Sequence, residues 1–213
     1  MDWLTSVWSF IRDNPDRFND LLVSHLRISL SALAVAILLY VPLGVLFARN
    51  ERIGPAAVGL ISAVRVIPSL ALVFVFVPLL GFGYRPALLA LIVLAAPPII
   101  LNTSAGVLNV DRSVLEAARG LGMNNAQVFF RVQLPLALPV ILAGIRSASV
   151  EIFASATLAS LIGVKTLGQF IVTGISLLDT TYLLAGGIPI VLLVLGSELI
   201  LGGLERIVTP PTS

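Results

Sequence analysis

Five long apolar stretches, almost free of charge, constrain this chain more than any other feature. Together they hold only four of the chain's 24 charged side chains. Each is at least as long as the roughly 20 residues that a helix needs to cross a hydrocarbon core of about 30 Å. We therefore expect five membrane-spanning helices, within residues 28–48, 54–80, 86–108, 134–158 and 181–204.

The pattern within these stretches predicts the fold class. No alternation of apolar and polar residues over ten-residue segments is present, so we expect helical spans and an all-α membrane protein. Pro68 divides the long stretch 54–80 and predicts a kinked or broken helix there, because proline removes a backbone donor. Residues 163–178 are too short and too rich in glycine to span, and predict a surface or re-entrant helix. Residues 21–206 are expected to form one transmembrane domain.

The two ends of the chain are expected to be short additions to this domain. Residues 1–20 lack the basic start and apolar run of a secretory signal, so we expect them to be retained. Apolar residues at near-helical spacing over 2–12, including Trp3 and Trp8, predict an amphipathic helix in the lipid headgroup region. A frayed tail is the alternative. At the other end we expect a short tail, 207–213, and no second domain.

The composition removes several classes of function. Without cysteine there is no disulfide and no thiolate metal site, and the single histidine, His25, leaves little for imidazole chemistry, so we expect no metal site. A net charge of +2 without a basic run argues against nucleic acid as a partner, and leaves membrane lipid as the expected surroundings. An intramembrane protease would need Ser and His, or two Asp, at matching depth. His25 precedes the first stretch, and no Asp lies in any stretch.

The longest polar interruption, residues 109–133, lies between the third and fourth apolar stretches. Ser113 followed by Glu116 fits a capping box, which predicts the start of a short helix. Gly120 and Gly122 are expected to end that helix. The interruption therefore begins with a short capped helix rather than an ordinary loop.

A second short helix is expected in the same interruption. Asn124 with Gln127 three residues later can cap its start, and the region of Pro135 is expected to redirect the chain into the membrane. The predicted product is a hairpin of two short helices joined at a glycine elbow.

These residues also carry a known pattern: EAA, three residues, Gly, nine residues, Ile, any residue, Leu-Pro. All of its spacings are kept here, and only Ile is replaced, by Val. In this pattern the chain resembles the permease subunits of ABC importers. The matching residues are Glu116, Ala117, Ala118, Gly122, Val132, Leu134 and Pro135.

The resemblance extends over about residues 20–206 and is closest to the permeases of osmoprotectant importers, which carry glycine betaine, carnitine or choline. Three further stretches carry it. The Val164-Lys165-Thr166 segment departs from the glycine-rich form common in that branch. The three stretches are Ile67 to Leu72 with Gly81-Phe82-Gly83, Pro97-Pro98-Ile99 with Asn102, Thr103 and Gly106, and Gly163 to Gly168 with Gly174-Ile175.

The resemblance implies the core of a type I ABC importer permease with a coupling hairpin at 109–133. In such a family the hairpin sits in a groove of a separate cytoplasmic ATP-binding subunit, which binds ATP and Mg. A second permease, identical or homologous, and an extracytoplasmic solute-binding protein are the other implied partners. The residues implied in ATPase coupling are Glu116, Ala117, Ala118, Gly120, Gly122, Leu134 and Pro135.

The chain itself has no material for a nucleotide site. A P-loop needs Gly-Lys adjacent, because the glycine amides cradle the phosphates that the ammonium group reaches. The only lysine, Lys165, follows Val164. We therefore expect no enzymatic activity and no cofactor bound by this chain. The alternative substrates to osmoprotectants are methionine, other amino acids or other small solutes of ABC importers.

The implied topology follows from the hairpin. If 109–133 is cytoplasmic, five spans place the 49–53 turn, with Arg52, and the C-terminus inside as well. The N-terminus, 81–85 and 159–180 are then outside. The cations give only a weak positive-inside bias. The expected location is the bacterial cytoplasmic (inner) membrane, crossed several times.

Charged side chains within the spans are expected to face other helices or a wet pathway, because they are costly in lipid. The four are Arg65, Arg146, Glu151 and Glu198. Arg146 and Glu151 are five positions apart, so they do not share a helix face and need partners on other helices. A structural ion pair and a role in the pathway both remain open, and an ion-gradient secondary transporter is a further alternative.

Polar groups beside prolines could also line a translocation route or gate, since proline frees backbone carbonyls. These are Pro68 with Ser69, and Asn102 with Thr103. Membrane helices also tolerate proline without any such role. No compact aromatic cluster that could hold a quaternary ammonium group is expected from the sequence.

Overall fold

The structure is a computed structural model that describes residues 2–50 and 54–209. Every regular element of these two ranges is helical, which agrees with the predicted all-α class. Four helices are long and apolar enough to cross a membrane. They are built on α2 (Pro15–Arg49), α6 (Tyr84–Leu108), α9 (Leu134–Ser155) and α11 (Thr180–Val208).

The remaining predicted span is a broken helix. It consists of α3 (Gly54–Val64), α4 (Ser69–Val75) and α5 (Val77–Leu80), and the two halves meet at 94°. The break falls at Arg65–Pro68, as Pro68 predicted. With this bent pair counted as one span, the number of spans is the predicted five.

The first span begins earlier than the apolar stretch does. Helix α2 starts at Pro15 rather than near residue 28, because proline suits the first turn of a helix and no breaker follows until Pro42. His25, which precedes the apolar stretch and was therefore expected to precede the first span, belongs to the spanning helix instead. His25 lies within α2, fully buried, and its Nε2 is 3.1 Å from the carbonyl oxygen of Phe153.

Helix α6 is the centre of the bundle. Of the 18 most apolar consecutive residues of this helix, 67% are buried, whereas the figure is 17% for α2 and for α11. Small residues let the neighbouring helices approach it. A Cβ on Gly44 of α2 would lie 2.6 Å from the Cβ of Thr103, and one on Gly144 of α9 would lie 2.6 Å from the Cβ of Asn102.

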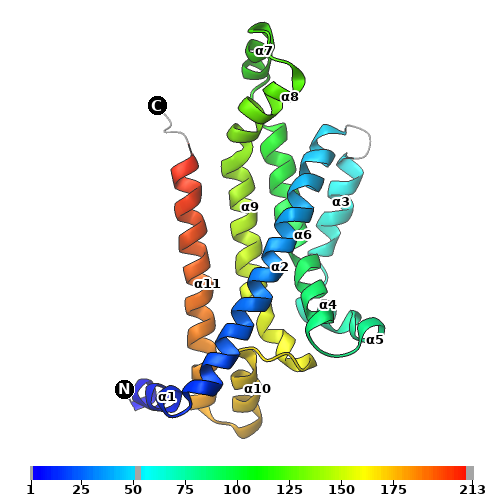
Figure 1. Ribbon diagram of the computed structural model, residues 1–213. Helices are drawn as coiled ribbons and strands as arrows, with labels where there is room; N and C mark the ends of the chain where they lie inside the picture. Colours follow the sequence, from blue (N-terminus) through cyan, green and yellow to red (C-terminus); the bar gives the residue numbers. More distant parts are fainter. Residues whose placement is uncertain (1, 51–53, 210–213) are drawn as a thin grey trace.

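The two ends of the bundle carry different elements (Figure 1). At one end lie the polar hairpin, the end of α2, the start of α3 and the end of α11. At the other lie α1 (Asp2–Asp13), α4 with α5, η2 (Ala156–Ile162) and α10 (Gly168–Leu177). This distribution of elements between the two ends agrees with the topology expected for five spans. Arg52 and residues 210–213 of the predicted tail lie outside the described residues.

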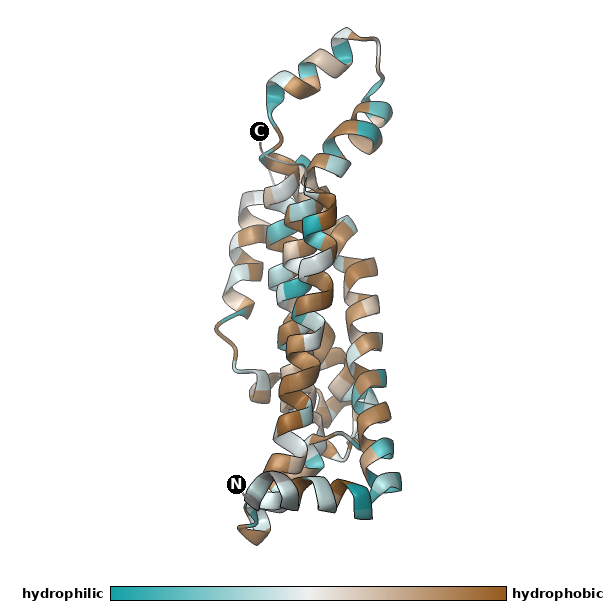
Figure 2. Ribbon diagram, turned by 90° about the vertical axis from the view of Figure 1, so that its left-hand side faces the viewer, coloured by the Kyte–Doolittle hydropathy of each residue, from teal (hydrophilic) through white to brown (hydrophobic). Residues whose placement is uncertain are grey.

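Helix α1 lies across the end of the bundle instead of along the spans (Figure 2). Its Phe10 contacts Phe170 of α10 edge-on, at 5.6 Å between ring centroids, and Tyr182 of α11 at 4.6 Å. Arg17 lies over the Phe170 ring, 5.3 Å from its centroid. The fold thus gathers aromatic rings that are far apart in the sequence. Because Phe170 is fully buried, the cluster fastens α1 and α10 to α11.

Candidate functional site

The hairpin begins with α7 (Arg112–Gly120), whose start differs from the predicted one. Asp111, not Ser113, is the N-cap: its Oδ1 accepts the backbone N–H of Ser113 at 2.8 Å. An ionised carboxylate is a strong cap because it also meets the positive end of the helix dipole. That hydrogen bond from the Ser113 backbone holds the pKa of the Asp111 carboxyl below its usual range. The predicted pairing of Ser113 with Glu116 is replaced by this cap.

Gly122 ends α7 as predicted, in a Schellman motif. Its φ is +86°, a left-handed conformation that favours glycine. The Gly122 N–H donates to the carbonyl of Arg119 at 2.9 Å, and the Met123 N–H donates to that of Ala118 at 3.3 Å. The spacing between the EAA triplet and the glycine is therefore explained by these helix-end hydrogen bonds, which join Gly122 and its neighbour to the last turn of α7. Gly120 remains within the helix.

The second arm of the hairpin is α8 (Asn125–Val128), and its predicted capping box is confirmed. Asn124 Oδ1 accepts the N–H of Gln127 at 2.9 Å, and Gln127 Oε1 accepts the N–H of Asn124 at 2.9 Å. The expected redirection near Pro135 is wrong, however. Helix α8 continues through η1 (Phe129–Gln133) into α9, as one helical stretch over Asn125–Ile162.

The segment η1 is a π-helical turn, and Pro135 explains its position. Proline offers no N–H, and its ring crowds the carbonyl four residues before it, so the ladder cannot continue in α-helical register. The N–H of Leu134 instead donates five residues back, to Phe129. The Leu-Pro pair of the motif thus sets the join between hairpin and span.

Two contacts fix the base of the hairpin to the bundle. The Gln133 side chain donates from Nε2 to the carbonyl of Val107, at the end of α6, at 3.0 Å. Arg49, at the end of α2, lies over the Phe129 ring, with Cζ 4.9 Å from the centroid. The roles of Gln133 and Arg49 were not predicted from the sequence, because neither residue belongs to the motif.

The two sides of α7 differ in exposure. Leu115 and Ala118 are buried against the rest of the hairpin and the bundle. On a different face Val114, Ala117 and Leu121 form an exposed stripe, spaced three and four residues apart, and Leu121 is 85% exposed. Glu116 is also exposed. The hairpin projects beyond the end of the bundle (Figure 1), so this small apolar stripe is presented there.

The charges within the spans fall into two groups. Arg146 of α9 pairs with two acids of α11, at 3.4 Å to Glu198 and 3.1 Å to Glu205. The prediction that Arg146 needs partners on another helix is confirmed. This ion pair joins α9 to α11, next to a hydroxyl contact of 3.4 Å between Ser149 and Ser197.

The second group, Arg65 and Glu151, lines a cavity of about 340 Å³ at the break between α3 and α4. Arg65 from this break, with Ser147 and Glu151 from α9, lines the cavity, and Leu94 and Pro97 of α6 complete it. Among the described residues, no cationic nitrogen lies within 4 Å of the Glu151 carboxylate. Glu151 and Arg65 therefore face a shared space without closing an ion pair.

The other predicted pathway residues have different surroundings. Thr103 is fully buried where α6 meets Gly44 of α2, and Asn102 donates from Nδ2 to the carbonyl of Pro98 at 2.8 Å. Pro68 is exposed at the break, and Ser69 begins α4. Their role in the pathway stays a prediction.

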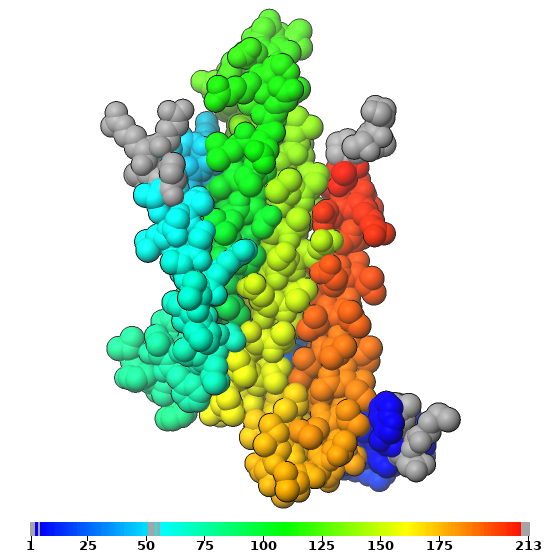
Figure 3. Space-filling model, turned by 180° about the vertical axis from the view of Figure 1, so that it is seen from behind, coloured from blue at the N-terminus to red at the C-terminus, as the bar shows by residue number. Residues whose placement is uncertain are grey.

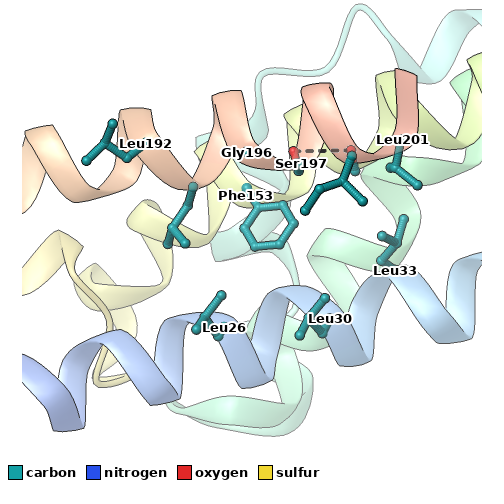
Figure 4. A pocket seen from close by; sticks show the side chains of 11 residues that line it. Leu26, Leu30, Leu33, Phe153, Leu192, Gly196, Ser197 and Leu201 are labelled. Carbon is teal, nitrogen blue, oxygen red and sulfur yellow. Dashed lines mark hydrogen bonds between the residues drawn. The ribbon is translucent and has the colours of Figure 1, made fainter. Parts of the chain in front are cut away.

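A separate pocket of about 310 Å³ lies between α2, α9 and α11 (Figure 4). Its lining is almost wholly aliphatic, with Leu26 and Leu30 on one side and Leu192 and Leu201 on the other. Ser149 and Ser197, whose hydroxyl oxygens are 3.4 Å apart, also line the pocket. Within the described residues, no group of three His, Asp or Glu side chains is placed to hold a metal ion.

Comparison with known proteins assigns this arrangement to a family. The family described as "Binding-protein-dependent transport system inner membrane component" matches residues 40–210, which include the hairpin and four of the five spans. The chain belongs to this family. It is a multi-pass membrane protein and the permease subunit of an ABC importer.

Individual relatives agree with the family. The permease is 39% identical over 207 residues to the carnitine transport permease protein OpuCB of Listeria monocytogenes, covering 97% of this chain and 95% of that protein. It is 36% identical, with the same coverage, to the glycine betaine/carnitine/choline transport system permease protein OpuCB of Bacillus subtilis. The fold matches a chain of the inward-facing MetNI methionine ABC transporter with a TM-score of 0.80 at 21% identity, covering 89% of this chain and 97% of that one.

Proposed function

We propose that this permease imports quaternary ammonium osmoprotectants such as glycine betaine, carnitine or choline, driven by ATP hydrolysis on a separate subunit. The observation that carries the proposal is the hairpin, whose α7 is capped, closed by Gly122 and anchored to the bundle at its base. The solute class is supported by the names of the two relatives described above, which match over nearly the whole chain.

The ATP-binding subunit docks on the exposed stripe of α7. Val114, Ala117 and Leu121 provide an apolar patch with a small residue at its centre, which lets another backbone approach. The π-helical turn at Phe129–Gln133 and the bond from Gln133 to Val107 connect this patch rigidly to α9 and α6. Movement of the ATPase is thereby passed to the spans.

The orientation follows from that docking. The hairpin, the end of α2 and the C-terminal end of α11 face the cytoplasm, and the N-terminus faces outward. Helix α1 then lies in the outer headgroup region, with Trp3 and Trp8 exposed. The extracytoplasmic solute-binding protein docks at this outer end, near α10.

A second permease, identical or homologous, covers the face on which α3, α6, α9 and α11 lie side by side (Figure 3). This face carries the irregular backbone at Arg65–Pro68, which is tolerated at membrane depth only against protein or water. It also carries the cavity of Arg65 and Glu151. The solute route runs along this face between the two permeases, and Glu151 supplies an acid for a cationic solute.

The test is solute-stimulated ATP hydrolysis. The permease, its ATP-binding subunit, its partner permease and its solute-binding protein are reconstituted together in liposomes. Glycine betaine, carnitine or choline is expected to stimulate both ATPase activity and uptake. Stimulation by methionine alone would move the permease to another substrate class, and uptake that follows an ion gradient without ATP would overturn the proposal.

A further inference from the structure

An arginine-lined cavity of about 350 Å³ lies at the base of the hairpin, between α2, α6, α7 and η1. Arg49 lines it from the end of α2, and Arg112 and Arg119 line it from α7. Arg112 and Arg119 are two helical turns apart, so they share one face of α7. Arg49 is held in place by the ring of Phe129. Three arginines from two helices thus line one space.

Nothing in the described part of the chain neutralises these three arginines. The ion pairs found there within 4 Å are those of Arg146 in the spans. The nearby acids, Asp111 and Glu116, do not reach any of the three guanidinium groups within that distance. The cavity therefore carries a concentrated positive charge that attracts an anion.

A second cavity, also of about 350 Å³, adjoins the first between α2, α3 and α6. The two share Ala48 and Leu108 in their linings, and Phe47 and Val58 make the second one largely apolar. The pair lies at the hairpin end of the spans. A cationic cavity that opens onto an apolar one matches a ligand with an anionic head and a hydrocarbon chain.

We propose that Arg49, Arg112 and Arg119 bind the phosphate group of an anionic phospholipid, one acyl chain of which lies in the apolar cavity. Free phosphate would not need the apolar cavity. The ATP-binding subunit is a poorer fit, because the arginine face of α7 is opposite the exposed stripe of Val114 and Leu121. The bound lipid sets the angle of the hairpin to the membrane surface.

The test measures lipid binding to the permease purified in mild detergent together with its ATP-binding subunit. Native mass spectrometry gives apparent dissociation constants for added phosphatidylglycerol and phosphatidylcholine. Phosphatidylglycerol is expected to bind more tightly. Arg112→Gln and Arg119→Gln are each expected to weaken it about five-fold, the factor that corresponds to about 1 kcal/mol per cation at an anionic surface. Phosphatidylcholine binding is expected to be unchanged by either substitution.

Matched variants control for charge and for shape. Arg206→Gln removes a cation at the same end of the bundle but outside both cavities, and is expected to leave the preference for phosphatidylglycerol intact. Val58→Trp fills the apolar cavity and is expected to weaken the binding of phosphatidylglycerol. Leu60→Trp, on the exposed side of α3, is expected to leave that binding unchanged. Together with Arg112→Gln and Arg119→Gln, these three variants separate the arginine cavity from general surface charge.

Three results would overturn the proposal. One is equal affinity for the two lipids. Another is displacement of phosphatidylglycerol by millimolar inorganic phosphate with Val58→Trp having no effect, which would identify a free anion site. The third is loss of the ATP-binding subunit from Arg112→Gln or Arg119→Gln while lipid binding is unchanged, which would assign the arginines to that interface.

Discussion

The backbone N–H of Met123 donates to the carbonyl of Ala118 across the end of α7, at 3.3 Å, and this bond closes only because Gly122 between them has a φ of +86°. The alanine of the EAA triplet and the glycine after it are thus parts of one helix end. This geometry fixes the angle between the two arms of the hairpin.

Gly122→Ala is expected to destabilise the hairpin by about 1 kcal/mol, because a Cβ is strained in the left-handed region. Open space surrounds the glycine, so the effect is one of backbone conformation and not of a clash. The measurement is the thermal midpoint of the purified complex, together with its solute-stimulated ATPase activity. Gly120→Ala is the control, since Gly120 is helical and also open. Equal losses in both variants would argue against the Schellman geometry as the cause.

Gly144→Ala is expected to loosen the contact between α9 and α6. The added Cβ would lie 2.6 Å from the Cβ of Asn102 and 2.7 Å from the carbonyl oxygen of Pro98, so one helix must shift. A cost of about 1–3 kcal/mol is expected for such overpacking, measured by denaturation in detergent. Gly203→Ala on α11, with nothing within 4 Å, is expected to leave stability unchanged or higher. A tolerated Gly144→Ala would show that the helices are not closely packed there.

Arg146→Gln is expected to lower stability by about 1–3 kcal/mol, because Glu198 and Glu205 lose their shared cation within the membrane. The cost is below that of a fully buried pair, since all three side chains keep some exposure. The additional substitutions Glu198→Gln and Glu205→Gln are expected to restore part of the lost stability. No restoration in this triple variant would mean that Arg146 acts through packing instead.

Glu151→Gln is expected to reduce uptake of a cationic solute such as choline while assembly with the ATP-binding subunit survives. The substitution keeps the shape of the side chain and removes the charge beside Arg65 in their shared cavity. Uptake into liposomes and co-purification are measured together. Unchanged uptake would remove Glu151 from the proposed pathway, and loss of assembly would give it a structural role.

The sequence predicted those features of the fold that depend on local pattern. Apolar stretches long enough to span, the break at Pro68, the Asn124–Gln127 capping box and the end of α7 at Gly122 all arise from neighbouring residues. The start of α7 was misplaced because Asp111 and Ser113 are both good caps, and only the backbone geometry distinguishes them.

Features made by residues far apart in the chain could not be predicted in the same way. The cluster of Phe10, Phe170 and Tyr182 draws on three helices, and the partners of Arg146 lie about fifty residues further on. The cation–π contact of Arg49 with Phe129 likewise depends on how α2 meets the hairpin. Helix packing, not sequence spacing, brings these groups together.

Crosslinking from the exposed stripe of α7 tests the central claim most directly. The chain has no cysteine, so Ala117→Cys introduces a unique thiol on the hairpin, and Ser176→Cys on α10 provides an exposed control at the other end. Ala117→Cys is expected to crosslink to the ATP-binding subunit in intact membranes, with the yield changing when ATP is bound, and Ser176→Cys is expected to give no such product. Labelling of Ala117→Cys from outside the cell, with no crosslink to the ATP-binding subunit, would contradict the account.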